Sequence, residues 1–221
     1  MTAASAFLVL GLGNPGPEYA GHRHNLGFMV VEELASRHGI PVHERSRLAV
    51  QGAGAIGEVP VVLARPRTYM NLSGQAAQSL GVRLGIPPQR MLALVDDFTL
   101  PLGRVRIRRE GGTGGHNGLA SMIECLGTKD FPRIRLGIGP MPPGMDPADF
   151  VLEDFRPEEE QAVDALLARA ADAVEFLVEH GVEAAMNRFN GLADEAPRKA
   201  EPEAPRPVDA PPPRPEPAEG S

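Results

Sequence analysis

Five short segments place polar side chains directly after an apolar run or at the predicted start of a helix. They contain Asn14, His24-Asn25, Asn71, Asp96-Asp97 and His116-Asn117. Histidine takes up a proton near neutral pH, a carboxylate can orient it, and asparagine amides donate and accept hydrogen bonds. A histidine and a carboxylate without a protein nucleophile indicate general-base activation of water. The asparagines would then hold a substrate or stabilise a developing oxyanion.

No serine or cysteine in the chain has the sequence context of a catalytic nucleophile. The G-x-S-x-G pattern of a nucleophile elbow is absent. Ser73 follows Asn71 into a predicted helix, where we expect it near the helix N-terminus. Cys125, the single cysteine, lies on an apolar helical face and is expected to be structural.

A zinc site is a second use of the same residue types. His22, His24, His116 and Asp96 are the candidate ligands. His22 and His24 flank a predicted turn, where alternate residues need not converge, and the neighbouring Asn117 is a poor zinc ligand. The sequence therefore favours the metal-free interpretation and leaves the zinc site as an alternative.

Gly11, Gly13 and Gly16 spell G-x-G-x-x-G after an apolar run, the pattern of a dinucleotide-binding site. In such sites a helix begins inside the motif and presents its N–H groups to the pyrophosphate. Pro15 and Pro17 remove two of those N–H groups, and helical periodicity begins only near residue 25. We interpret the glycines as a tight turn after a strand. A nucleotide-dependent oxidoreductase remains an alternative that a cofactor titration would test.

The elements that must position these side chains follow from apolar periodicity and from glycine and proline breaks. Strands are expected over residues 7–13, 47–57, 59–65, 91–95, 104–108 and 133–139. Helices are expected over residues 25–38, 71–84, 118–126, 157–180 and 183–190. This alternation indicates one α/β domain over residues 1–190, with a central mixed β-sheet flanked by helices. Sites in such sheets form beyond the carboxyl ends of strands, so the five segments are able to meet in one crevice.

Composition limits the setting in which the domain works. From Gly191 onward, nine prolines and six alanines in 31 residues leave little to bury, so residues 191–221 are expected to be a disordered tail. No apolar run approaches the roughly 20 residues of a membrane-spanning helix, and the N-terminal run lacks a basic leader. A single cysteine suits a reducing compartment. We expect a cytoplasmic protein, without membrane association and monomeric by default.

Charge is distributed unevenly along the chain, whose net charge is −7. Residues 151–190 hold ten acidic residues against three basic ones, whereas residues 1–150 carry a small basic excess. Arg104, Arg106, Arg108 and Arg109 crowd one short segment that includes the predicted strand 104–108. An anionic partner is therefore expected at this strand despite the acidic total, with a solvated strand face as the alternative.

Four stretches resemble, in the same order, motifs of the bacterial-type peptidyl-tRNA hydrolase family. They are GLGNPGPEYAGHRHNLGF, PRTYMNLSG, LVDDFTLPLGRVRIRREGGTGGHNGL and DFPRIRLGIG, and the resemblance covers roughly residues 6–190. It implies a cofactor-free enzyme that cleaves the ester between a peptide and the terminal ribose of tRNA, and so recycles tRNA from aborted translation. An RNA-binding relative that has lost turnover is the alternative, which retention of the full polar set disfavours.

The resemblance also implies roles for individual residues. His24 would be the base that activates water, and Asp96 the carboxylate that orients it. Asn14 and Asn71 would position the peptide or the water, and Asn117 would assist water and ester binding. The remaining matches are crevice positions at Tyr19, Met70 and His116, and tRNA-phosphate positions at Arg108 and Arg135. The partner would be the acceptor stem and 3′ end of peptidyl-tRNA.

The chain departs from the family pattern at several positions. Val95 and Thr99 replace the usual histidine and aspartate around the catalytic aspartate, and His22 stands where threonine is usual. A basic residue expected near Met145 is missing, and Glu110 stands beside the arginines where glycine is common. These departures bear on phosphate affinity more than on the base–carboxylate pair.

Overall fold

The computed structural model describes residues 6–191. The expected disorder of the tail therefore concerns residues that, apart from Gly191, lie outside the described part of the chain. Within residues 6–191, seven strands form one mixed sheet in the order β2-β3-β4-β1-β5-β7-β6. The strands are β1 (Phe7–Gly11), β2 (Glu44–Arg45), β3 (Ala49–Ile56), β4 (Val59–Pro66), β5 (Met91–Pro101), β6 (Val105–Arg108) and β7 (Arg133–Gly139).

The α-helices are α1 (Leu26–His38), α2 (Ser73–Leu84), α3 (Asn117–Leu126), α4 (Pro147–Val151), α5 (Glu160–His180) and α6 (Val182–Asn190). Helices α1, α2 and α3 make three of the six connections between consecutive strands. Short 3-10 turns are η2 (Pro17–Tyr19), η3 (Arg23–Asn25), η4 (Met70–Leu72), η5 (Pro88–Arg90) and η6 (Pro157–Glu159). The predicted single α/β domain with a mixed central sheet is confirmed.

The sheet is parallel at its centre and antiparallel at both edges. Strands β4, β1, β5 and β7 run parallel, whereas β3 pairs antiparallel with β4 and β6 antiparallel with β7. Strand order reverses at β1, because the chain first builds β3 and β4 on one side and later β5 and β7 on the other. This reversal makes a crevice at the carboxyl ends of β1 and β5, where the polar segments lie.

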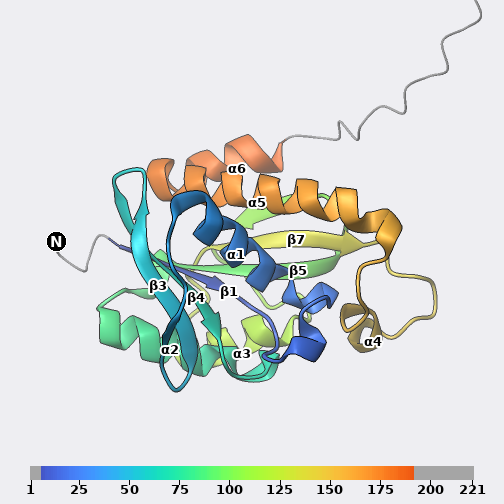
Figure 1. Ribbon diagram of the computed structural model, residues 1–221, viewed down its shortest axis with the longest axis horizontal. Helices are drawn as coiled ribbons and strands as arrows, with labels where there is room; N and C mark the ends of the chain where they lie inside the picture. Colours follow the sequence, from blue (N-terminus) through green and yellow to red (C-terminus); the bar gives the residue numbers. More distant parts are fainter. Residues whose placement is uncertain (1–5, 192–221) are drawn as a thin grey trace, which may run out of the picture.

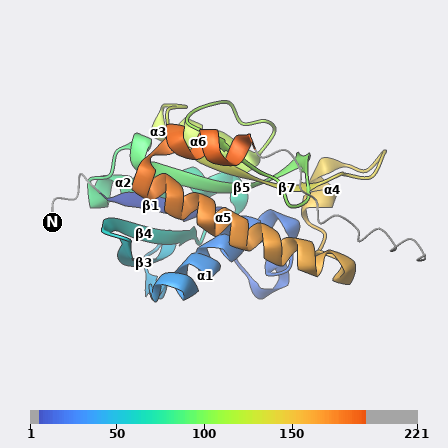
Figure 2. The ribbon, with the colours of Figure 1, turned by 90° about the horizontal axis from the view of Figure 1, so that it is seen from above.

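Helices cover both faces of the sheet, so the central strands are apolar on both sides. Figure 1 shows α5 and α6 above the sheet and α2 and α3 below it. Figure 2, turned by 90°, shows α5 running along the sheet between α1 and α6. One core packs α1, α5 and α6 against strand residues such as Val9 and Leu94. The second core packs α2 and α3 against the alternate residues, such as Leu10 and Ala93.

The glycine motif serves close packing in this structure. A Cβ on Gly11 would collide with the carbonyl of Gly27 in α1, and a Cβ on Gly27 would meet the Leu94 oxygen at 2.5 Å. Gly16 has φ of +126°, a backbone conformation that favours glycine. Helix α1 begins at Leu26, ten residues after the motif, as the sequence interpretation requires. The tight approach of α1 to β1 carries the preceding turn, which contains His24, toward β5.

Three features differ from the sequence-based expectations. Strand β5 continues to Pro101, so Asp96 and Asp97 lie within the strand and not after it. Their pairing with β7 maintains the strand beyond Leu94, the last residue that pairs with β1. Strand β2 and helix α4 were not predicted, although Asp146 and Pro147 form a recognisable helix start.

Among the helices of residues 6–191, none combines the length and apolarity needed to cross a membrane.

Candidate active site

His24 is held in place by the turn on which it lies. The turn η3 precedes α1, and Arg23, His24 and Asn25 are all buried there. The side-chain amide of Asn25 accepts from the Asn14 N–H at 2.8 Å and donates to the Asn14 carbonyl at 3.0 Å. This reciprocal pair locks the loop after β1 onto the histidine turn. The sequence analysis listed Asn25 beside His24 but missed this role.

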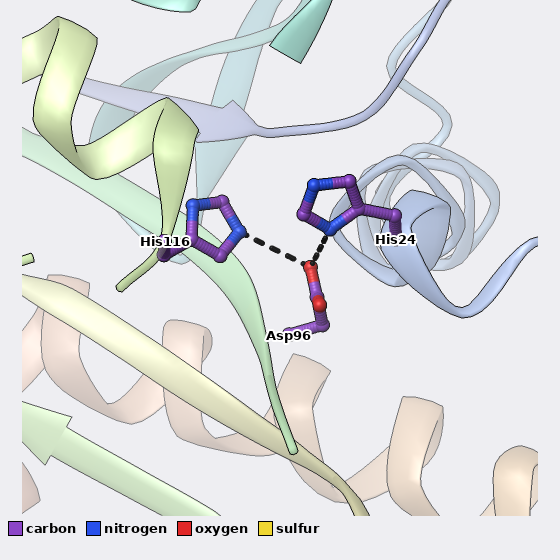
Figure 3. A group of neighbouring side chains, drawn as sticks. All are labelled: His24, Asp96 and His116. Atoms are coloured by element: carbon purple, nitrogen blue, oxygen red, sulfur yellow. Dashed lines mark hydrogen bonds and ion pairs between the residues drawn. The ribbon is translucent and has the colours of Figure 1, made fainter. Parts of the chain in front are cut away.

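Asp96 lies between two histidines (Figure 3). Its Oδ1 is 2.8 Å from Nδ1 of His24 and 3.1 Å from Nε2 of His116. His24 comes from η3, Asp96 from β5, and His116 caps the N-terminus of α3. The predicted His24–Asp96 pair is thus in contact, and His116 is a third member of the group.

The hydrogen-bond partners determine which nitrogen of each imidazole carries its proton. Nδ1 of His116 accepts from the backbone N–H groups of Gly118 at 3.1 Å and Leu119 at 3.3 Å. Its proton therefore lies on Nε2, which donates to Asp96. An ionised carboxylate only accepts, so Nδ1 of His24 also donates to Asp96. The lone pair of neutral His24 is then on Nε2, the nitrogen that can take a proton from water.

Electrostatics keep Asp96 ionised. Its side chain is 2% exposed, and burial by itself would raise the pKa of the carboxyl. Electrostatic attraction and hydrogen bonds from the His24 and His116 imidazoles outweigh burial and hold the pKa of Asp96 below its ordinary value. Asp96 is therefore a carboxylate throughout the neutral range, as an orienting acceptor must be.

His24, Asp96 and His116 also meet the distance requirement for a metal site, since their candidate ligand atoms lie within 4.8 Å of one another. The hydrogen bonds do not fit that use. A metal on Nε2 of His116 would require the proton on Nδ1, directly opposite the Gly118 and Leu119 N–H groups. The site would also offer one carboxylate oxygen already shared by two N–H donors. The arrangement fits a hydrogen-bonded acid–base group and not a zinc ligand set.

Asn14 and Met70 join the loop after β1 to the turn η4. Oδ1 of Asn14 accepts from the Met70 N–H at 2.8 Å, so the amide is oriented with Nδ2 available as a donor. Met70 is buried, and its sulfur lies where a Cβ on Gly118 would be. Asn71, the next residue, and Asn117, the first residue of α3, are exposed. Asn14 thus contacts the residue that precedes Asn71, whereas Asn117 lines the pocket beside His116.

A pocket of about 230 Å³ opens at the histidine group. Residues of η3, β5, the glycine loop that includes Gly114 and Gly115, α3 and β7 line it, and a further part of the wall comes from α4 and its N-cap. This part of the wall consists of Asp146, Pro147, Ala148 and Val151. The sequence analysis did not include these four residues.

Arg135, one of the two predicted phosphate residues, lines this pocket with an acidic partner. Its Nη1 is 3.3 Å from Oδ2 of Asp97, and its Nη2 donates to the Thr113 carbonyl at 2.9 Å. Oδ1 of Asp97 accepts from both the N–H and the hydroxyl of Thr99. Asp97 therefore holds Arg135 in place, and Thr99 holds Asp97. Thr99, which departs from the family pattern, thus has a structural role.

Arg108, the second predicted phosphate residue, lies outside the pocket on the edge strand β6. It is exposed and stands opposite Arg133 of β7, while Arg106 stands opposite Arg135. Directly opposed residues share one face of the sheet, and like charges there are destabilising. Of the four arginines on this face, Arg106 and Arg108 are exposed, so these two are placed to meet an anionic ligand.

Arg133 anchors the glycine loop beside the pocket. Its side chain is fully buried and donates to the carbonyls of Gly111 at 2.7 Å, Phe131 at 3.1 Å and Lys129 at 3.1 Å. Burial and the neighbouring charge of Arg135 lower its pKa to about 10, so it remains a cation at neutral pH. The sequence analysis missed Arg133 because nothing local distinguishes it from its exposed neighbours.

Tyr19 lies at the rim, in η2. Its ring makes edge contacts with Tyr69 at 6.4 Å and with His22 at 5.3 Å. Tyr69 is 57% exposed, next to the buried Met70. His22 itself is joined to Asp154 by a single antiparallel bridge and is not part of the histidine group.

Comparison with known proteins gives a consistent result. Residues 8–199 match the family model described as peptidyl-tRNA hydrolase. The peptidyl-tRNA hydrolase of Chloroflexus aggregans is 49% identical over 187 residues, covering 84% of this chain and 100% of the relative. That of Mycobacterium tuberculosis is 48% identical, covering 85% and 98%. The crystal structure of peptidyl-tRNA hydrolase from Acinetobacter baumannii has a TM-score of 0.78 at 36% identity, covering 86% and 96%.

Proposed function

The chain belongs to the peptidyl-tRNA hydrolase family, and we propose that it hydrolyses peptidyl-tRNA with His24 as the general base for water. The bond cleaved is the ester between the peptide and the terminal ribose of tRNA. The observation that carries the mechanism is the 2.8 Å contact between His24 and a buried, ionised Asp96. This contact leaves Nε2 of His24 unprotonated at the pocket.

In the proposed reaction, Nε2 of His24 takes a proton from water as the water oxygen attacks the ester carbonyl carbon. Asp96 orients the imidazole through Nδ1 and stabilises the imidazolium that forms. The tetrahedral intermediate then expels the ribose oxygen, which receives the proton from Nε2. The products are a free peptide carboxyl group and a tRNA with a free terminal hydroxyl, and His24 returns to its starting state.

Asparagine amides supply the hydrogen bonds that the substrate needs. Nδ2 of Asn14 is available because the amide oxygen is already bonded to the Met70 N–H. Asn71 lies on η4, and Asn117 is the first residue of α3. We assign Asn14 and Asn71 to the peptide or the water, and Asn117 to the water and the ester carbonyl. We also assign Tyr19, Met70 and His116 to the substrate crevice, as the family resemblance implies, and of these His116 lines the pocket.

Arginines on β6 and β7 are assigned to the tRNA. A planar guanidinium suits a phosphate, so Arg108 and Arg135 would bind the backbone near the 3′ end and acceptor stem. Arg108 forms no ion pair within the described residues, whereas Asp97 partly offsets Arg135. The proposal assigns catalysis to residues 1–190, acting as a monomer in the cytoplasm, and gives the tail no catalytic part.

Hydrolysis of N-blocked aminoacyl-tRNA, with the free-amine form as a control substrate, tests the proposal. We expect release from the blocked substrate only, and a loss of about 10²–10⁴-fold in His24→Ala. A chelator should leave the rate unchanged. Full activity in His24→Ala would remove the proposed base, and a rate that fell with chelator would restore the zinc interpretation. If the unmodified chain bound tRNA without hydrolysing the substrate, the alternative of an RNA-binding protein that has lost turnover would be supported instead.

A further inference from the structure

Arg23 directly precedes His24 in the sequence, and the proposed chemistry does not use it. Its side chain is 3% exposed, which is unusual for arginine. Nη1 and Nη2 contact Oε1 and Oε2 of Glu159 at 3.2 and 2.6 Å, a two-pronged ion pair between residues 136 positions apart. A buried ion pair of this kind is costly to desolvate, so stability alone does not account for it.

The surroundings of Arg23 connect it to the wall of the pocket. Its guanidinium carbon lies 4.8 Å from the ring centre of Phe150 in α4 and 4.7 Å from that of Phe155. The Arg23 N–H also donates to the Glu153 carbonyl at 3.0 Å. Phe150 directly precedes Val151, which lines the same pocket as His24. The Arg23 side chain therefore contacts α4, which forms part of the pocket wall, and Arg23 is the residue directly before the proposed base, His24.

Glu159 is itself held firmly at the start of α5. Its Oε2 accepts from the Arg156 backbone N–H at 2.9 Å and from Nε of Arg156 at 3.2 Å. The contacts with Arg156 thus orient the Glu159 carboxylate independently of Arg23. Helix α5 in turn packs against α1 in the core. A rigid helix at one end and two aromatic rings at the sides leave the Arg23 guanidinium little freedom.

We propose that Arg23, braced by Glu159, is a positioning residue that holds the His24 imidazole on Asp96 and keeps the α4 wall in register with it. Arg23 touches neither Asp96 nor the space of the substrate, so it acts through the backbone of η3. This inference rests on the proposed role of His24. Its consequence is a fall in turnover with little change in substrate binding, since small misplacement of a base is enough to slow proton transfer.

Arg37 provides a matched control. It also joins the α1 side of the molecule to α5, through Asp172 at 2.7 Å and Glu175 at 3.3 Å. Arg37 lies in the last turn of α1, at the end of the helix away from His24. Arg37→Met therefore removes an arginine bridge to the same helix without touching the histidine turn.

The experiment measures kcat and KM for N-blocked aminoacyl-tRNA, at a temperature where circular dichroism shows every variant folded. We expect kcat of Arg23→Met to fall about 10–100-fold, with KM within about threefold of the unmodified chain. Lysine cannot reproduce the two-pronged contact, so kcat of Arg23→Lys should lie between that of Arg23→Met and that of the unmodified chain. Glu159→Gln should follow Arg23→Met, and it carries the test if Arg23→Met does not fold. Arg37→Met should retain kcat.

A second measurement does not depend on activity. In proton NMR spectra, the Nδ1–H resonance of His24 should be visible in the unmodified chain and in Arg37→Met, and broadened by exchange in Arg23→Met and Glu159→Gln. Unchanged kcat and an unchanged resonance in both of these variants would overturn the inference. Activity that survives His24→Ala would instead overturn the proposed function, and the resonance would still decide whether Arg23 positions His24.

Discussion

His24 and Asp96 are 72 positions apart in the chain, and their side chains meet at 2.8 Å. The contact exists because β5 extends past β1 while the close packing of α1 on β1 brings the η3 turn over the same edge. Since Asp96 is ionised and buried, it accepts from Nδ1 and leaves Nε2 as the basic nitrogen. The orientation of the base is thus determined by a residue that need not contact the substrate.

Asp96→Asn should lower kcat far more than it weakens binding. The amide can present its NH₂ group to Nδ1 of His24, which would place the imidazole proton on Nε2 and remove the basic lone pair. A loss of about 10²–10⁴-fold in kcat is expected, by analogy with tautomer errors in other histidine-dependent hydrolases. Steady-state kinetics check this, with Asp172→Asn on α5 as a control. A defect confined to KM would reassign Asp96 to substrate binding.

His116 has two separable functions, as the N-cap of α3 and as a donor to Asp96. His116→Ala should lose both, with about 1 kcal/mol less stability and a lower kcat. Asparagine is a good N-cap but too short to keep both contacts, so His116→Asn should recover stability without recovering kcat. Urea denaturation and kinetics on the two variants check this. Equal kcat in His116→Asn and the unmodified chain would show that the bond to Asp96 has no part in turnover.

The arginine face of β6 and β7 should determine the salt dependence of tRNA binding. Each lost phosphate contact lowers the slope of log affinity against log salt by about 0.7–0.9. We expect this change in Arg108→Gln, and a smaller one in Arg135→Gln because Asp97 already offsets its charge. Arg45→Gln, in β2 at the opposite edge of the sheet, is the control. If both β6 and β7 variants kept the original slope, these arginines would be a solvated face.

Glu159 should make stability depend on pH in the acid range. Burial acts to raise its pKa, but the hydrogen bonds from Arg23 and Arg156 outweigh burial and lower it from 4.5 to about 2. A lowered folded-state pKa gives stability that is present above the unfolded value and is lost as the pH falls toward about 2. Glu159→Gln should therefore cost about 3 kcal/mol near neutral pH and progressively less below about pH 4.5.

Urea denaturation at about pH 7 and about pH 3 measures this difference. Glu158→Gln is the control, because Glu158 is 67% exposed and its one ion pair within residues 6–191 is with Arg156, at 3.4 Å. A cost of Glu159→Gln that was the same at both pH values would show that the ion pair with Arg23 contributes no pH-dependent stability.

Local sequence was sufficient for much of the fold. Strand β7 was predicted with its observed bounds, α1 ends at His38 as predicted and is followed by Gly39 with φ of +60°, and Ser73 lies at the N-terminus of α2 as expected. These features depend on periodicity and on backbone preferences of single residues, which neighbouring residues reveal. The same local signal was available for α4 at Asp146-Pro147, and its omission was an error of interpretation.

The residue types of the candidate site could also be read from the sequence, but not the contacts among them. His24, Asp96 and the three asparagines were identified because their types suit general-base chemistry and because their segments resemble a known family. Nothing in the sequence distinguished His116 as a second donor to Asp96, Asn25 as a clamp on Asn14, or Asp97 as the partner of Arg135.

The tertiary structure alone decided which proton lies on which nitrogen, and which charges are paired. The protonated nitrogen of His116 depends on the N–H groups at the start of α3, and the burial of Arg23 depends on a carboxylate 136 positions away. Such contacts arise from the register of parallel strands and the packing of helices on them, both of which join distant segments. Sequence periodicity reports only on near neighbours, so it predicts the elements and the candidate residues but not the geometry that makes one histidine a base.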